Sequence, residues 1–188
     1  MEQTTIRTAA RRRVLDMAYI ALFAVLIAVC SWISIPLPVP FTLQTFGVFC
    51  AVGLLGGKRG TFSVLIYILL GVIGLPVFSG FSGGLGILLG ATGGYIAGFV
   101  FSALVYWLIT SVFGKKTWSM VLGMLAGLLI CYALGTVWYM AVYTKNTGAI
   151  GIAAALSRCV LPFIIPDVVK IGLAAVITKK LSKHIRML

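Results

Sequence analysis

The chain has 188 residues, of which 61% are hydrophobic and 10% charged, and 15 Lys and Arg outweigh 3 Asp and Glu. A soluble domain of this length cannot hide so many apolar side chains, so composition excludes an ordinary soluble fold and indicates an all-α polytopic membrane protein. The basic residues lie at the ends of apolar runs, which is typical of membrane topology and argues against a nucleic-acid partner.

Six apolar segments predict six transmembrane helices within a single domain over residues 1–188. They are residues 14–33, 43–57, 61–75, 90–113, 118–143 and 162–179. A full span needs about 20 residues. The second and third segments are shorter, so we expect them to span poorly or to lie partly sunk, with a tight charged turn between them at residues 56–60.

The basic residues also predict the orientation of the chain, because cytoplasmic segments are enriched in Lys and Arg. With six spans, one side receives Arg7, Arg11, Arg12, Arg13, Lys58, Arg59, Lys115, Lys116, Lys179, Lys180, Lys183 and Arg186. The other side has only Lys145 and Arg158. Both termini are therefore expected in the cytoplasm, with residues 1–13 forming a basic N-terminal segment.

Two connections on the opposite side carry no charge. Residues 35–42 read IPLPVPFT, and residues 75–92 are rich in glycine. Membrane proteins tolerate irregular backbone where it folds against a cavity or a partner, so we expect these segments to line a cavity. The alternative is a flexible and weakly polar loop.

Asp16 lies at the cytoplasmic edge of the first predicted span, which leaves Asp167 as the one acidic residue deep inside a span, and Lys170 follows it on the same helical face. A charge within the membrane costs roughly 2.5–3.5 kcal/mol even on lenient scales, so such a pair suggests a function. Pro162 and Pro166 precede Asp167, which is expected in the first turn of a regular helix. The alternative is a self-neutralising pair that locks helix packing.

These residues predict a ligand site that opens on the outer side. Asp167 would accept hydrogen bonds from a ligand N–H, and Lys170 would face a carboxylate or carbonyl. Arg158, near the outer edge, is a second candidate for a carboxylate. The other predicted contacts are Gln44, Thr42 and Ser79 as polar groups and Phe41, Phe78, Tyr95 and Trp138 as apolar walls.

No catalytic, metal or cofactor site is expected. Cys30, Cys50, Cys131 and Cys159 form no CxxC pair, and the one histidine, His184, lies in the basic tail. No phosphate-binding loop is present, so the chain is not expected to hydrolyse ATP.

Small residues in the first span suggest a place for close helix contact. Ala21, Ala24 and Ala28 are spaced three and four apart and fall near one side of the helix. They predict a docking face for a membrane partner; the alternative is packing inside the protein.

Three segments together resemble the BioY family, the substrate-binding S components of energy-coupling factor biotin transporters. They are IPLPVPFTLQTFGVF at 35–49, the glycine-rich stretch at 53–99, and PFIIPDVVK at 162–170. Two positions depart from the family pattern: Pro166 stands where the family usually has Gly or a similar residue, and Val25 interrupts the small-residue motif of the first helix. Neither departure touches Asp167 or Lys170.

The resemblance implies a multi-pass S component of a prokaryotic plasma membrane, with six helices and no enzymatic activity. It implies high-affinity binding of biotin from outside, and docking to a transmembrane coupling protein that carries two ATPase subunits. Biotin fits the predicted site: its ureido ring offers N–H donors to Asp167 or Gln44, and its carboxylate needs a cation. The alternatives are an S component for another small vitamin, or a membrane-embedded enzyme that uses Asp167 and Lys170 as an acid–base pair. Against the enzyme, the sequence offers no nucleophile, no set of metal ligands and no second carboxylate for such a site.

Overall fold

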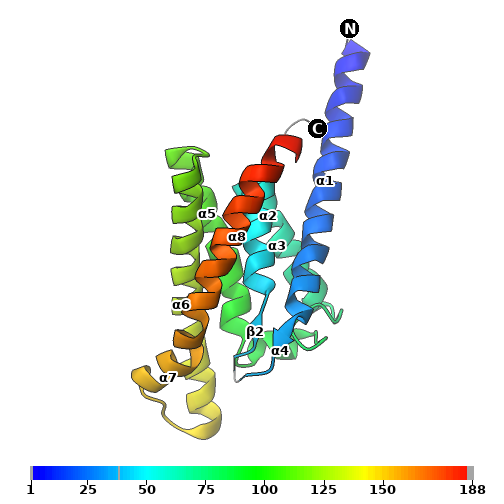
Figure 1. The fold of residues 1–188 in the computed structure, drawn as a ribbon. Coiled ribbons are helices and arrows are strands. Elements are labelled where there is room, and N and C mark those ends of the chain that lie inside the picture. The colour runs from blue at the N-terminus through cyan, green and yellow to red at the C-terminus, as the bar shows by residue number, and fades with distance from the viewer. Residues whose placement is uncertain (1, 38, 186–188) are drawn as a thin grey trace.

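The computed structural model describes residues 2–37 and 39–185, with side chains at residues 12–37 and 39–182. These residues form a helical bundle with one small antiparallel sheet (Figure 1). The elements are α1 (Glu2–Trp32), β1 (Ser34–Ile35), β2 (Phe41–Thr42), α2 (Gln44–Leu55), α3 (Gly57–Val72), α4 (Leu85–Leu89), α5 (Gly93–Phe113), α6 (Thr117–Thr147), α7 (Ile152–Cys159) and α8 (Leu161–Ile185).

Four of these helices are long and apolar enough to cross a membrane. The crossing segments are Arg12–Trp32, Gly93–Phe113, Thr117–Thr147 and Leu161–Ser182. Helices α2 and α3 have 12 and 16 residues, which is short of the about 20 that a full span requires. The prediction of six spans is therefore confirmed only for the four long helices.

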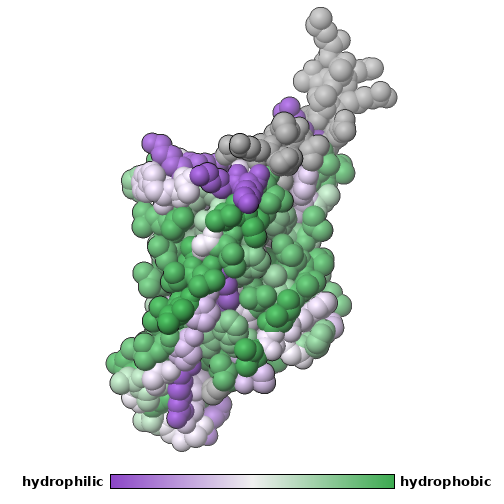
Figure 2. Space-filling model, viewed as in Figure 1, coloured by the Kyte–Doolittle hydropathy of each residue, from purple (hydrophilic) through white to green (hydrophobic). Residues whose placement is uncertain are grey.

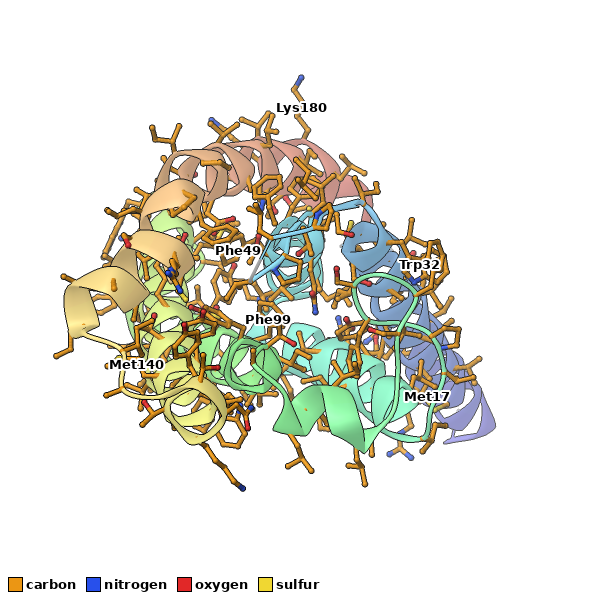
Figure 3. All side chains as sticks on the ribbon, turned by 90° about the horizontal axis from the view of Figure 1, so that it is seen from below. Met17, Trp32, Phe49, Phe99, Met140 and Lys180 are labelled. Atoms are coloured by element: carbon orange, nitrogen blue, oxygen red, sulfur yellow. The ribbon has the colours of Figure 1, made fainter. Side chains whose placement is uncertain are left out.

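Helix α2 explains how a short helix can remain inside a membrane bundle. Figure 3 shows α2 near the centre, with longer helices around it and Phe49 and Phe99 in the interior. Most α2 side chains are buried, and α2 packs against α1, α3, α5 and α8. Protein rather than lipid surrounds α2, so its length does not have to match the bilayer.

The outer surface is apolar because lipid, not water, faces it. Along α1, Phe23 and Ile27 are buried, while Leu22, Val25 and Val29 are exposed. Figure 2 shows a broad hydrophobic surface below a hydrophilic upper rim. Both the start of α1 and the end of α8 lie at this rim end (Figure 1). The side chains of Arg7, Arg11, Lys183, His184 and Arg186 lie outside the described residues.

Helices α5 and α6 approach each other closely. A Cβ on Gly94 would overlap the side chain of Trp138, and one on Gly98 would lie 3.0 Å from Cys131 Sγ. Small residues let the two backbones come together, as membrane helices require when lipid tails already satisfy apolar side chains.

Two local predictions are wrong, and one helix was not predicted. Helix α3 already begins at Gly57, so the expected charged turn is reduced to Gly56, whose φ is +82°. Helix α7 was not predicted. Helix α8 begins at Leu161 and runs through Pro166, so Asp167 lies in its second turn rather than its first. Pro166 is close to the start of α8, where its missing N–H removes only one bond to an early carbonyl.

The two uncharged connections fold against the bundle. Strands β1 and β2 pair, with Ser34 opposite Thr42. The segment between α3 and α4 is tied to the end of α1, where Ser31 Oγ donates to Val77 O at 2.5 Å and Trp32 Nε1 to Pro76 O at 2.8 Å.

Candidate ligand-binding site

A cavity of about 220 Å³ lies at the end of the bundle opposite the chain termini. Both uncharged connections contribute to its walls, as predicted, together with α2, α5, α6 and α8. Its polar lining residues are Thr42, Gln44, Thr45, Ser79, Ser82, Thr92, Tyr95, Tyr132, Asp167 and Lys170. Its apolar lining residues are Val39, Pro40, Phe78, Ile87, Ile96, Phe99, Cys131, Cys159 and Phe163.

Asp167 and Lys170 form a buried ion pair on α8. Asp167 is 2% exposed and Lys170 is 5% exposed, and Lys170 Nζ lies 2.7 Å from Asp167 Oδ1. The three-residue spacing places both side chains on one face of the helix. Neither charge is solvated by water to any extent, so each depends on the pair and on further hydrogen bonds.

Neighbouring elements supply those hydrogen bonds. Asp167 Oδ1 also accepts from Thr45 Oγ1 at 3.0 Å, and Oδ2 accepts from Tyr132 Oη at 2.6 Å. Lys170 Nζ donates to Thr42 O at 2.6 Å and to Thr45 Oγ1 at 3.2 Å. The three N–H bonds of the ammonium thus have three acceptors, which makes the pair a fixed polar floor.

The ring of Phe41 packs against the ammonium group of Lys170. Its ring centroid lies 4.2 Å from Lys170 Nζ, and the ring stacks on Phe163 with centroids 6.2 Å apart. Phe41 is not among the cavity-lining residues, and its ring makes a cation–π contact with Lys170. Its role as a ligand wall stays a prediction.

Gln44, Phe78, Ser79 and Tyr95 do line the cavity, as predicted. Gln44 Nε2 donates to Tyr67 Oη at 2.8 Å, which fixes the orientation of the amide. Phe78 packs over Gly71, where a Cβ would overlap its ring. Tyr95 Oη lies 3.3 Å from Thr136 Oγ1 and donates to Cys159 O at 3.3 Å.

Trp138 and Arg158 are not among the residues that line the cavity, and their ligand contacts stay predictions. Trp138 packs over Gly94 and donates from Nε1 to Gly90 O at 2.9 Å, so its ring is held against α5. Arg158 is exposed on α7, 5.9 Å from the ring centroid of Tyr143. Hydrogen bonding to Tyr143 raises the pKa of Arg158.

Sequence reasoning missed Thr45 and Tyr132, which both contact Asp167. Thr45 directly follows Gln44, and helical geometry turns it toward α8. Tyr132 lies in the middle of α6, away from the membrane edges where tyrosine is usually enriched. That central position is the signal from which it could have been found.

Two of the three alanines of the predicted docking face on α1 are buried, which favours the alternative of packing inside the protein. Ala24 is 1% exposed and Ala28 is 4% exposed, because α1 packs here against α2 and α3. Gly47 on α2 allows this contact, since a Cβ there would lie 3.1 Å from Ile27 Cα. Ala21 is exposed, and the docking face on α1 stays a prediction.

Comparisons with known proteins agree in fold and family. The sequence model described as "BioY family" matches residues 2–187. The chain is 45% identical over 163 residues to the "Biotin transporter BioY" of Thermotoga maritima, covering 86% of this chain and 92% of that protein. It is 35% identical over 180 residues to the "Biotin transporter BioY" of Rhodobacter capsulatus, covering 90% and 94%.

A solved structure also matches. It is the crystal structure of "the S-component for biotin from an ECF-type ABC transporter", with a TM-score of 0.82 and 29% sequence identity. The match covers 92% of this chain and 93% of the other.

Proposed function

The chain belongs to the BioY family, and on that premise we propose that it binds biotin in the cavity above Asp167 and Lys170. It is the biotin-specific S component of an energy-coupling factor transporter, a multi-pass protein of the cell membrane and not an enzyme. Its substrate is biotin.

The observation that carries the site assignment is the buried, fully bonded ion pair at the floor of a small cavity. Biotin has three recognisable parts: a ureido ring with N–H donors, an apolar bicycle and a carboxylate. The cavity offers a carboxylate, apolar walls and an ammonium. Its volume of about 220 Å³ is below the 300–1,000 Å³ typical of drug-sized ligands, so a compact ligand fits best.

Two ligand contacts follow from the bonds already present. The longest bond of Lys170 is the one to Thr45 Oγ1, at 3.2 Å, and the biotin carboxylate replaces it. The ureido N–H groups bond to Asp167 Oδ2 or to the carbonyl of Gln44. Thr42, Ser79, Phe78 and Tyr95 complete the contacts as cavity-lining residues.

The same proposal includes six crossing segments, with α2 and α3 as the short ones. The basic end of the bundle faces the cytoplasm together with both termini, because Lys and Arg favour that side. The cavity then faces outward, where biotin enters. Residues 1–188 act as one substrate-binding domain.

Uphill uptake needs a partner, since no phosphate-binding loop occurs in the sequence. We assign this role to a transmembrane coupling protein with two ATPase subunits. The exposed Ala21 on α1 offers one place for close helix contact with it.

Equilibrium dialysis of the purified chain against labelled biotin tests the function. We expect tight binding of one biotin per chain, with the biotin recovered unchanged. Tighter binding of another vitamin in competition would favour the alternative S component. Chemical conversion of biotin would favour the enzyme that uses Asp167 and Lys170 as acid and base.

A further inference from the structure

A second, larger cavity lies at the basic end of the bundle, away from the ligand site. It has a volume of about 650 Å³. Its walls include four cationic side chains from four parts of the chain: Arg12, Arg59, Lys115 and Lys179. The one carboxylate in the lining is Asp16, which pairs with Arg59 at 2.8 Å. The lining therefore has an excess of three positive charges.

Thr178 adds a hydrogen-bond donor that has no partner. It lines the same cavity and is 1% exposed, and its Oγ1 is the buried side-chain polar atom left without a hydrogen bond among the described residues. Other helical threonines in this bundle donate to the carbonyl four residues earlier, as Thr61 and Thr110 do at 2.8 Å. Thr178 makes no such bond, and a buried hydroxyl left unpaired is unfavourable.

The remaining lining mixes hydroxyl groups, among them Thr110, Thr117 and Ser182, with apolar side chains. Leu15, Leu54 and Met120 contribute hydrocarbon surface next to the cations. Helices α3 and α6 both begin at this end, and the N-terminus of a helix favours an anion. A ligand that matches this lining has a phosphate at one end and an apolar body at the other.

We propose that this cavity binds the phosphate group of an anionic phospholipid from the adjoining membrane leaflet. Lys115 and Lys179 contact the phosphate oxygens. Thr178 Oγ1 faces Gly53 in the lipid-free chain, and a rotation about χ1 turns it to donate a hydrogen bond to the headgroup. The lipid backbone lies along the apolar wall. Free phosphate would leave that wall uncovered, so the lipid is the better match.

Lysine neighbours give the experiment a matched control. Lys116 and Lys180 follow Lys115 and Lys179 directly but are not part of the lining. Lys180 points away from the bundle in Figure 3. Lys115→Gln/Lys179→Gln and Lys116→Gln/Lys180→Gln therefore remove equal charge from the same end of the molecule.

The measurement is native mass spectrometry of the delipidated chain with added phosphatidylglycerol. We expect the first double variant to bind it about tenfold more weakly than the parent, and the control to stay within about twofold. Thr178→Val should weaken binding by about fivefold without lowering the unfolding temperature of the lipid-free chain. Biotin binding should be unchanged in all variants, because its cavity lies at the other end.

Several results would overturn the proposal. Equal losses in the two double variants would mean attraction to a basic surface alone. If the chain bound inorganic phosphate but not phosphatidylglycerol, free phosphate would be the ligand. If the first double variant bound lipid as the parent does but no longer bound the coupling protein, the cavity would be a site for that partner. If the first double variant fails to bind biotin and is misfolded, Thr178→Val decides: unweakened lipid binding in that variant contradicts the proposal.

Discussion

The two cavities handle charge in opposite ways. At the ligand site one anion and one cation, both almost fully buried, share a network in which their oxygens and N–H bonds are paired. The larger cavity at the basic end is lined by Arg12, Lys115 and Lys179. Asp16 is the one carboxylate in its lining, and it pairs with Arg59. A buried charge needs an opposite charge or hydrogen-bond partners within the protein, whereas a charge near the lipid headgroups can pair with solvent or lipid.

The largest effect is expected from breaking the Asp167–Lys170 ion pair. Asp167→Asn leaves Lys170 buried without its anion, so we expect a loss of about 3–5 kcal/mol in stability, and biotin binding weakened at least about a hundredfold. Equilibrium dialysis and thermal unfolding in detergent measure the two effects. A variant that is stable and binds biotin as the parent does would show that Asp167 has no ligand role.

Lys170→Met tests which part of biotin meets the ammonium. Because Lys170 is proposed to hold the carboxylate, we expect biotin to lose about tenfold to a hundredfold more affinity than a neutral biotin amide does. Arg158→Met, at the exposed outer edge, serves as the comparison variant and should change neither affinity. Similar losses for the acid and the amide in Lys170→Met would place the carboxylate elsewhere.

Tyr132→Phe sharpens the comparison by removing one hydrogen bond and keeping the ring. The lost bond is the one from Tyr132 Oη to Asp167 Oδ2, at 2.6 Å. A hydrogen bond to a charged group contributes about 1.5–3 kcal/mol, so we expect biotin affinity to fall by about tenfold. Isothermal titration measures this. Unchanged affinity and stability would mean that the Asp167 carboxylate does not depend on Tyr132.

The smallest effect is expected where a charge pair lies at the surface. Asp16 and Arg59 are 2.8 Å apart, but their side chains are 38% and 49% exposed. Asp16→Asn should therefore cost less than about 1 kcal/mol and leave biotin binding unchanged. It is the control for Asp167→Asn, and a large loss of binding in it would contradict the separation of the two ends.

The sequence predicted the parts of the fold that follow from hydropathy and charge. The long spans, the buried Asp167–Lys170 pair and the cavity-lining connections follow from the cost of placing charge or bare backbone in lipid. Helix α7 and the early start of α3 depend on local packing. The burial of Ala24 and the contact of Thr45 with α8 depend on how helices rotate against each other, and spacing along a single helix does not determine this.

The Asp167–Lys170 pair also has an electrical consequence. Its two charges sum to zero, so the empty site contributes no net charge to the transmembrane field. Biotin brings one negative charge through its carboxylate, and a bacterial cell is negative inside. Moving that charge inward costs about 2.3 kcal/mol per 100 mV of membrane potential. Because the Asp167–Lys170 pair is neutral, the binding site has no net positive charge to cancel the negative charge of the biotin carboxylate. The voltage therefore opposes uptake, and the energy to overcome it has to come from a source outside this chain.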